Sequence, residues 1–283
     1  MLLALTVLGG VIWHILPGEF MKLLFPTISI SLWLILTLYR LARIYRNRGS
    51  YVSSYHSVVE SGDQEFGVIR VNVQVPKHKA FKPGEYLHLY FTSLRWRYRF
   101  QSHPFMITWY EDGKETVDGK EFDVTNLTFL IQPRSGLTER LGRELQLSEL
   151  SSGKAEFRNS ILFDGPYGQH LHLERYETVM LVAKGIGITG VLPYAGYLMQ
   201  RNYHDAKIKE LLRLESTPNK DDLRNSLRRD ATRKVDLFWE LELNRQEEWV
   251  SDHLRALQDQ DPDRVSVHGV SHETELTLHS VLV

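Results

Sequence analysis

The sequence contains no cysteine. A chain without cysteine forms no disulfide and has no thiolate metal site, no iron-sulfur cluster and no cysteine nucleophile. Any redox chemistry must therefore come from a bound cofactor.

An excess of either charge is also missing. The 283-residue chain has 34 basic and 35 acidic residues, which gives a formal net charge of -1. Because a general nucleic-acid binder needs a basic surface to contact phosphates, this balance argues against one. The length suffices for two domains of ordinary size, or for one domain and a membrane segment.

Charged side chains are absent from residues 1–18 and again from residues 23–39. Each stretch is near the shortest length that crosses the hydrocarbon of a bilayer. The second is followed at once by RLARIYRNR, whose four arginines place that end in the cytoplasm by the positive-inside tendency. We therefore predict a membrane hairpin of two helices in residues 1–48. A cleaved signal peptide is the alternative, although the start has no positive charge and LPGEF is a poor cleavage site.

His14 lies near the outer end of the first stretch, beside Trp13. A histidine inside a membrane segment is a candidate functional residue, and haem ligation is its most obvious use. The alternative is an interfacial histidine partnered with Trp13 in the headgroup region. The local sequence leaves both interpretations open.

The middle of the chain alternates apolar and polar residues with a period of two, which is typical of strands. Residues 68–76, VIRVNVQVP, and residues 85–91, EYLHLYF, show this most clearly. RFQSHPFMITW and NLTFLIQPR predict further strands, with a polar loop at residues 111–125 between them. Short strands at this spacing predict a small antiparallel barrel or sandwich. Residues 136–145, GLTERLGREL, predict a short helix whose N-terminus presents free amides to an anion.

From residue 178 a buried strand leads through a glycine turn into a helix. TVMLVAKGIGITGVLPYAGYLMQ places Gly185, Gly187 and Gly190 in G-x-G-x-x-G spacing. Such glycines let the backbone approach phosphates, and the helix N-terminus adds amide donors and a favourable dipole. A plain tight turn is the alternative. The pattern predicts the first unit of a nucleotide-binding α/β domain.

The remaining chain continues this α/β pattern. KVDLFWELE, residues 234–242, predicts a later strand, and EEWVSDHLRALQ predicts a helix with Val250, His253, Leu254 and Leu257 on one face. Residues 201–234 hold ten basic and six acidic residues. We interpret them as a helix extension and a solvated loop, with a lipid-facing basic patch as the alternative.

In this order the features resemble one family. A membrane helix with a histidine, a second helix ending in arginines, a barrel with HPF, then DGPYG and KGIGITGVLPYA are similar to the fungal ferric reductase branch of the transmembrane flavocytochromes, which include the NADPH oxidases. The resemblance extends to about Pro262. It implies a membrane helical hairpin (residues 1–48) followed by a ferredoxin-reductase-like module. That module is an antiparallel β-barrel FAD domain (51–170) and an α/β NADPH-binding domain (175–283), which is incomplete at its C-terminus.

The resemblance implies a membrane ferric-chelate reductase. In the family, NADPH gives a hydride to FAD in the cytoplasm, FAD passes single electrons to two haem b groups, and the outer haem reduces a ferric chelate. It therefore implies ferric chelates as acceptors, membrane lipid as surroundings, and a multi-pass protein of the plasma membrane with cytoplasmic FAD and NADPH domains. Hydride transfer needs near contact between the two cofactors, so the two domains must hold them together.

The HPF motif carries the flavin side of this resemblance. His103, Pro104 and Phe105 match the motif that lines the flavin. The family generally has Ser or Thr next, where a hydroxyl bonds the ring. Here Met106 cannot donate a hydrogen bond, and Thr108 follows two residues later. The implied flavin contacts are these five residues.

The phosphate side of the flavin site matches a second segment. Gly136, Leu137 and Thr138 match the family's phosphate-side turn. The basic residue normally six positions before that threonine is Gln132 here. Arg134 is the replacement we expect, because its guanidinium can still reach phosphate oxygens.

Two further segments match the nucleotide side. DGPYG, residues 164–168, matches the junction between the domains, although a simple β-turn would explain it by itself. GIGIT, residues 185–189, matches the turn that receives the NADPH phosphates. Arg245 is a weak candidate for a 2′-phosphate contact, and NADH stays open as the nucleotide. The implied NADPH contacts are Gly165, Pro166, Gly168, Gly185, Ile186, Gly187, Ile188 and Thr189.

Two departures from the family concern the ends of the chain. The family binds two haems with a histidine pair on each of two helices. His14 matches the outer member of the second pair, but the inner position falls at Met1 and the partner helix is absent. The family also closes with a Cys-Gly strand, for which this chain has no cysteine. We therefore expect a truncated, C-terminal portion of a ferric reductase, which would associate with the remaining haem-binding helices to complete a haem site.

Three other functions remain as alternatives. A superoxide-producing oxidase shares the flavin and nucleotide motifs. A catalytically inactive membrane interaction subunit would explain the missing haem ligands. A cytosolic diaphorase activity would pass electrons from FAD to a soluble acceptor without haem.

Overall fold

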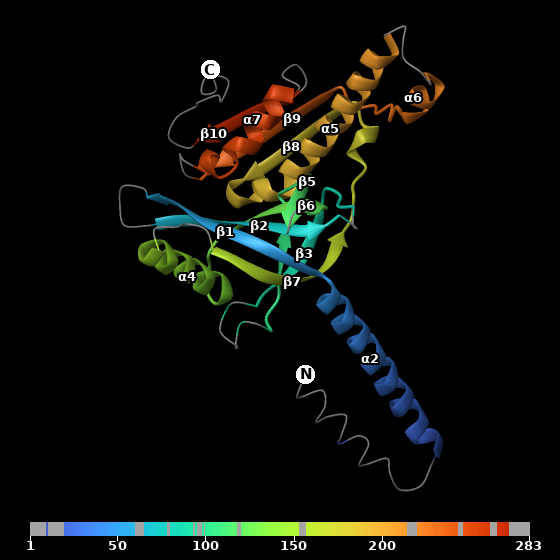
Figure 1. The fold of residues 1–283 in the computed structure, drawn as a ribbon, viewed down its shortest axis with the longest axis vertical. Coiled ribbons are helices and arrows are strands. Elements are labelled where there is room, and N and C mark those ends of the chain that lie inside the picture. Colours follow the sequence, from blue (N-terminus) through green and yellow to red (C-terminus); the bar gives the residue numbers. More distant parts are fainter. Residues whose placement is uncertain are drawn as a thin grey trace. The chain divides into compact units, whose positions relative to one another are not determined.

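The computed structural model describes residues 10, 20–59, 65–77, 80–92, 94, 98, 100–117, 120–152, 157–213, 220–242, 246–260 and 265–271. The chain divides into two compact units, Met1–Asn47 and Arg48–Val283. The first contains a helix, and the second contains both sheets (Figure 1).

The first unit contains α2 (Phe20–Arg46), which includes the predicted second membrane stretch, residues 23–39. Among the described residues, Pro26–Arg46 is the one segment long and apolar enough to cross a membrane, with a mean hydropathy of 1.4. Large apolar side chains such as Trp33, Ile35 and Leu36 are exposed on it. A helix with exposed apolar side chains suits a lipid surrounding. The first stretch of the predicted hairpin, and His14 with it, lies outside the described residues, apart from Gly10.

The second unit begins with a seven-stranded antiparallel sheet, in the order β4-β3-β7-β1-β2-β6-β5. Its alternating sequences place one row of side chains inside and the other outside. The strands are β1 (Arg48–Val59), β2 (Glu65–Pro76), β3 (Glu85–Phe91), β4 (His103–Met106), β5 (Trp109–Val117), β6 (Lys120–Ile131) and β7 (Phe157–Gly168).

The two ends of this sheet meet at the residues between β4 and β5. The Ile107 N–H donates to the Glu85 carbonyl on β3 at 3.2 Å, and the next N–H, of Thr108, donates to the Thr128 carbonyl on β6 at 2.8 Å. One short segment therefore bonds to strands at both ends of the order. This closes the sheet into the predicted antiparallel barrel.

The barrel interior is a continuous apolar core. Alternate residues of β2, β3 and β6, such as Val71, Leu89 and Phe129, are fully buried in it. The helix α4 (Leu137–Ser152) follows β6 and lies beside the barrel strands (Figure 1). Leu137 and Leu141 on this helix are buried in the same core. The predicted short helix is therefore present, and its own side chains anchor it to the barrel.

A three-stranded parallel sheet follows, in the order β10-β9-β8. A 3₁₀ turn, η1 (Leu173–Arg175), precedes it, and the 3₁₀ turn η2 (Gly185–Gly187) links its first strand to α5. Parallel neighbours joined by helical connections are the pattern of an α/β domain. The remaining elements are β8 (Thr178–Lys184), α5 (Ile188–Arg213), α6 (Lys220–Ser226), β9 (Lys234–Leu241), the 3₁₀ turn η3 (Gln246–Trp249), α7 (Ser251–Gln260) and β10 (Val265–Ser271).

The helices α5 and α7 cover one face of this sheet, and barrel residues complete that core. Val250, Leu254 and Leu257 of the predicted apolar face of α7 are buried there. Val68 and Leu130 of the barrel belong to the same cluster. On the opposite face of β8, Met180 and Val182 are 64% and 67% exposed.

The predicted polar loop at residues 111–125 is wrong. Residues 111–117 and 120–125 form the facing halves of β5 and β6, whose register pairs Asp112 with Thr125 and Lys114 with Asp123. Cross-strand pairs support the hairpin, including a Lys114–Glu121 ion pair of 2.9 Å. Residues 111, 112, 114 and 121–123 of this hairpin are exposed. Exposed strand positions need no apolar side chains, so this composition resembles that of a loop.

Three further strands lie in segments that sequence reasoning did not assign to strands: β1, β10 and β7, of which only the DGPYG end was singled out, as a domain junction. β1 has the polar sequence RGSYVSSYHSVV, and it is held between β2 and β7 by antiparallel pairing on both sides. β10 pairs in parallel with β9 along its whole length. In residues 201–234, α5 supplies the expected extension, while α6 is a short exposed helix within the expected loop.

Candidate functional site

The expected flavin strand, HPFM, is β4, at one end of the strand order in the barrel sheet. It pairs with β3 through Leu89 opposite His103 and Leu87 opposite Phe105. The Phe105 ring is half-buried and packs edge to face on Phe91, with ring centroids 6.4 Å apart. The interior therefore fixes Phe105, while Pro104 is exposed. The strand thus offers His103, Pro104 and one edge of Phe105 to a ligand.

Met106 and Thr108 differ in what they offer. Met106 is half-buried, whereas Thr108 has 0% of its surface exposed. The Thr108 hydroxyl is buried without a hydrogen-bond partner in the described part of the chain. A buried hydroxyl does not open onto a solvent-accessible ligand site. It therefore does not replace, in this conformation, the hydroxyl that Met106 lacks.

The expected phosphate turn lies just before α4. Gly136 has a φ of +87°, and a Cβ at that position would meet no atom within 4 Å. The Thr138 hydroxyl accepts from the Arg134 N–H at 2.9 Å and donates to the Arg134 carbonyl at 3.3 Å. Leu137 has a buried side chain, so only its backbone can reach a ligand. The first amides of a 16-residue helix and the exposed Arg134 guanidinium are therefore available to an anion.

The fold brings this turn close to β4. Trp109 pairs with Thr128 on β6, and the Thr108 N–H donates to the carbonyl of the same residue. Because the pairing is antiparallel, the end of β4, which precedes Thr108, lies near the last residues of β6. The turn at residues 132–136 follows β6 at once. A ligand with an aromatic ring and a pyrophosphate could bridge the two. The open glycine, the free amides and the guanidinium fit the phosphates of FAD.

The DGPYG segment is the end of β7, where Tyr167 pairs with Tyr86 and Gly168 with Glu85 on β3. The peptide bond between Gly165 and Pro166 is cis. Gly165 has a φ of +132°, and a Cβ there would lie 2.9 Å from the Leu87 side chain. Gly165 is therefore required by packing within the barrel. Tyr167 donates to the fully buried Asp164 carboxylate at 3.0 Å.

The GIG segment forms the turn η2 between β8 and α5, as the motif predicts. Gly185 has a φ of +49°, and a Cβ on Gly187 would meet no atom within 4 Å. The Trp239 indole N–H on β9 donates to the Gly185 carbonyl at 2.9 Å, and the Thr189 hydroxyl donates to the Ile186 carbonyl at 3.0 Å. Two carbonyls of the turn are thus fixed by side-chain hydrogen bonds, while the space beside Gly187 is free for a ligand. Its shape fits a dinucleotide phosphate.

The backbone of this turn suits a phosphate, but the nearest side-chain charge is negative. A Cβ built on Gly185 would lie only 2.5 Å from Glu242 Oε2, which places a carboxylate against the turn. The nearby Lys184 ammonium lies 2.7 Å from Glu240 Oε1, and its hydrogen bond with Glu240 raises the pKa of Lys184. That cation is therefore already paired. Sequence reasoning missed Glu242, because only the parallel pairing of β8 with β9 brings it to the turn.

An ion pair joins the barrel to the nucleotide domain. The Arg70 guanidinium on β2 donates to both Asp252 oxygens, at 2.8 and 3.0 Å, and to the Trp249 carbonyl at 2.8 Å. Burial raises the pKa of Asp252, but the hydrogen bonds from Arg70 and the charges of His253 and Arg70 outweigh it, so the pKa lies below its usual value. The forked geometry holds α7 in one orientation against the barrel.

An aromatic contact lies beside this ion pair. The Trp109 ring stacks on His253 of α7 with ring centroids 4.7 Å apart and planes 8° apart. A Cβ on Gly196 of α5 would lie 2.8 Å from the same ring. Burial lowers the pKa of His253 to about 4, against the opposing effect of Asp252. Trp109 begins β5 and is separated from β4 only by Ile107 and Thr108, so the chain just after the expected flavin strand is held against both nucleotide-domain helices.

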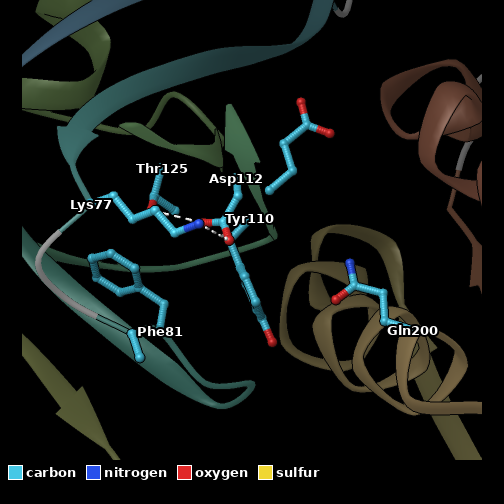
Figure 2. A pocket seen from close by; sticks show the side chains of 8 residues that line it. Lys77, Phe81, Tyr110, Asp112, Thr125 and Gln200 are labelled. Atoms are coloured by element: carbon cyan, nitrogen blue, oxygen red, sulfur yellow. Dashed lines mark hydrogen bonds and ion pairs between the residues drawn. The ribbon is translucent and has the colours of Figure 1, made fainter. Parts of the chain in front are cut away.

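A pocket of about 610 Å³ opens elsewhere, between the barrel hairpin and α5. Figure 2 shows Tyr110 extending between Phe81 and Gln200. Asp112 accepts from the Thr125 hydroxyl at 3.2 Å and lies 2.9 Å from the Lys77 ammonium. Burial raises the pKa of Tyr110, so its hydroxyl stays protonated. The lining residues include none of the expected FAD or NADPH contacts: Lys77, Ala80, Phe81, Tyr110, Glu111, Asp112, Thr125 and Gln200.

Comparison with known proteins supports the flavin domain directly. Residues 64–171 match the family of FAD-binding domains, which spans β2 to the end of β7. This range includes both halves of the expected flavin site, β4 and the turn before α4. The chain therefore contains an FAD-binding domain.

Curated relatives match beyond that domain. The ferric reductase transmembrane component 5 of Saccharomyces cerevisiae is 33% identical over 134 residues, which are 46% of this chain and 17% of the relative. Dual oxidase 2 of Sus scrofa is 26% identical over 216 residues, which are 75% of this chain and 11% of the relative. The chain thus spans less than a fifth of the length of either relative. Among solved structures, a ferredoxin-NADP+ reductase from Plasmodium falciparum aligns with a TM-score of 0.46 at 12% identity, over 84% of this chain and 80% of that chain.

The ferric reductase and dual oxidase matches, of 134 and 216 residues, are both longer than the FAD-binding match at residues 64–171. The chain is therefore similar to the ferric reductases and to the dual oxidases.

Proposed function

We propose that the chain is the flavin- and nucleotide-binding part of a membrane reductase that carries electrons from NAD(P)H through FAD to ferric chelates. The observation that best supports this proposal is that β4 lies close to the open turn before α4. Both are inside the segment that matches an FAD-binding domain. The yeast relative is named as a ferric reductase component, which supports ferric iron as the acceptor.

Within this proposal, each part of the flavin site has one task. The α4 amides and Arg134 hold the pyrophosphate, Gly136 lets it approach the backbone, and Thr138 fixes Arg134 through its backbone. His103, Pro104 and Phe105 contact the ring. Bound FAD would accept two electrons with a hydride and release them singly. Because Met106 offers no hydroxyl, only backbone groups of β4 would bond the ring edge there.

The nucleotide would lie at the η2 turn, with Gly185, Ile186, Gly187, Ile188 and Thr189 as its contacts. Gly165, Pro166 and Gly168 remain expected contacts from the end of β7. NADPH is the nucleotide that the family resemblance implies. Glu242 opposes an additional phosphate close to the turn, so we expect NADH to be accepted as well.

The membrane part would anchor this module. In our proposal α2 crosses the plasma membrane as one of several spans, with the arginines at its end and both cofactor domains in the cytoplasm. His14 would ligate haem b with a histidine from the remaining haem-binding helices, with which this chain would associate. Electrons would then leave the flavin towards the membrane.

A superoxide-producing oxidase is the second candidate, because dual oxidase 2 matches more of this chain than the ferric reductase component does. The two functions share the flavin and nucleotide steps and differ in the acceptor. NADPH-dependent oxygen consumption by membranes that contain the chain would support the oxidase. Reduction of a ferric chelate without oxygen consumption would support the reductase.

The flavin site is tested with the full chain in detergent micelles. Arg134→Ala removes the exposed guanidinium before α4, whereas Arg143→Ala removes one from the second turn of the same helix and serves as the control. Loss of a charge-assisted phosphate contact should weaken FAD binding roughly tenfold, which corresponds to about 1.4 kcal/mol. The Arg143→Ala chain should bind FAD as the unchanged chain does. FAD affinity is measured by the quenching of flavin fluorescence.

Two outcomes would contradict the proposal. Equal FAD affinity in both variants would remove Arg134 from the site. A colourless chain that takes up no added FAD would contradict the reductase and the oxidase together, and would favour an inactive interaction subunit.

A further inference from the structure

The connector between the barrel and the nucleotide domain contains a cluster that none of the above functions uses. It has the sequence His-x-His-x-Glu at His170, His172 and Glu174, and the last of these lies in η1. One ligand atom from each residue lies within 4.8 Å of the others. Glu174 Oε1 is 3.0 Å from His172 Nδ1, and Glu174 Oε2 is 3.4 Å from His170 Nε2.

His170 is buried in a way that leaves its ring nitrogens unsatisfied. Its side chain is only 8% exposed, and neither nitrogen makes a hydrogen bond within the described part of the chain. Tyr194 stacks on the ring with planes 9° apart, and Tyr197 packs edge-on with centroids 5.0 Å apart. These aromatic contacts prevent the ring from turning to water. A buried imidazole whose two nitrogens make no hydrogen bond is unfavourable, so its presence points to a ligand on that ring.

The charge of the cluster suits a cation. The Glu174 carboxylate, whose side chain is 14% exposed, is the anionic member of the cluster, and Arg201 is a nearby cation. Arg201 is itself held by Asp230 through two hydrogen bonds. Glu85 on β3 also interacts electrostatically with His170. The Glu174 carboxylate therefore lies against both histidines, while the nearby guanidinium is already paired.

We propose that His170, His172 and Glu174 bind a divalent transition-metal ion of the Zn²⁺ class. Two imidazoles and one carboxylate form a common donor set for Zn²⁺, with a water in the fourth position. Ligand atoms of a tetrahedral site at Zn²⁺ bond lengths lie about 3.4 Å apart. Each histidine nitrogen is already at about this distance from one Glu174 oxygen, His172 Nδ1 from Oε1 and His170 Nε2 from Oε2. The remaining gap closes by rotation of His172, whose side chain is 52% exposed.

The position of this metal site gives it a structural task. The Glu174 carbonyl accepts from the Ala231 N–H at 2.9 Å, and the Leu173 carbonyl accepts from the Thr232 hydroxyl at 3.3 Å. The Tyr194 hydroxyl bonds the Gln169 carbonyl at 3.4 Å. An ion on the cluster would join the residues that leave β7 to those that precede β8. It would thereby fix the connector between the flavin and nucleotide domains.

The experiment uses the full chain in detergent micelles after treatment with a chelator. Zn²⁺ binding is measured by competition with a chromophoric chelator, and Mg²⁺, which prefers oxygen ligands, is the control ion. His172→Ala and Glu174→Gln each remove one ligand, whereas His204→Ala removes a histidine from α5 outside the cluster. We expect both ligand variants to bind Zn²⁺ roughly tenfold or more weakly and His204→Ala to bind it unchanged. Zn²⁺ should raise the unfolding temperature of the unchanged chain, and Mg²⁺ should not.

Two results would overturn this assignment. One is equal Zn²⁺ affinity in the unchanged chain and in His172→Ala. The other comes from Co²⁺ added to the unchanged chain: absence of the visible absorption of a four-coordinate nitrogen and oxygen site excludes the geometry without any variant. The unfolding temperature in chelator shows that each variant is folded. FAD content is a separate readout, because the metal site does not depend on the flavin.

Discussion

The barrel and the nucleotide domain each place a helix N-terminus after a glycine with positive φ, yet their surroundings differ. Before α4, Gly136 is open and Arg134 is exposed beside it. Before α5, Gly185 faces the Glu242 carboxylate, and the nearest lysine is paired. Both turns therefore offer a helix N-terminus to an anion, and the neighbouring side chains determine how tightly each turn binds one. We therefore expect the flavin side to bind phosphate groups more tightly than the nucleotide side.

The two domains also differ in how they bury their cores. The barrel closes on itself, whereas the three-stranded sheet is covered on one face by α5 and α7 together with barrel residues. Met180 and Val182 lie exposed on its other face. The nucleotide domain therefore depends on its contact with the barrel.

Trp109→Ala should weaken the contact between the nucleotide domain and the barrel, and we expect it to have the largest effect on stability. Trp109 is buried between α5 and α7, so its loss should lower the free energy of unfolding by about 3–5 kcal/mol. Hydrogen exchange should rise more in β8 and β9 than in β3. Urea unfolding and exchange of the full chain in detergent measure both effects. Phe122→Ala, an exposed aromatic residue of the same hairpin, should change little, and an equal rise of exchange in both sheets would contradict the dependence.

Lower pH should weaken the contact between Trp109 and α7, because His253 becomes protonated when the chain unfolds. Its pKa falls from 6.5 to about 4 on folding, so between these pH values the unfolded chain binds more protons than the folded one. The free energy of unfolding should therefore decrease as the pH is lowered from 6.5 to about 4, by at most about 3 kcal/mol. Thermal unfolding across this range measures it. His253→Phe keeps the stack on Trp109 and should flatten part of the profile, and an unchanged profile would contradict the role of His253.

Glu242→Gln should have the smallest effect and sharpen the comparison of the two turns. Removal of the carboxylate beside Gly185 should tighten NADPH binding by about 1 kcal/mol, or roughly fivefold in Kd. Titration calorimetry measures the affinity. Glu210→Gln, on the exposed side of α5, is the matched control. An affinity that stays the same in both variants would show that the Glu242 charge is not felt at the site.

Local pattern predicted the elements whose residues meet the core. Alternation located β2 and β3, and the glycine spacing located η2 and the start of α5, because these features follow from neighbouring residues. The same reasoning missed β1 and took part of the β5–β6 hairpin for a loop. Those segments are polar and become strands through pairing with partners distant in sequence.

The candidate site divides in the same way. The HPF strand and the turn at Gly136 were identified as motifs, and they lie in β4 and directly before α4. Their contacts with FAD remain predictions. The burial of Thr108 could not be anticipated, because the closure of the barrel puts that side chain under the sheet while leaving Met106 half-buried.

The sequence by itself determined the order of the parts: an apolar helix ending in arginines, an alternating barrel, and a glycine turn between a strand and a helix. These depend on local composition and period. Only the tertiary structure decided which charges meet the turns, that His253 stacks on Trp109, and that the His170 ring is buried between two tyrosines. The physical reason is that strand order and helix packing bring such groups together. The spacing of residues along the chain does not specify strand order or helix packing.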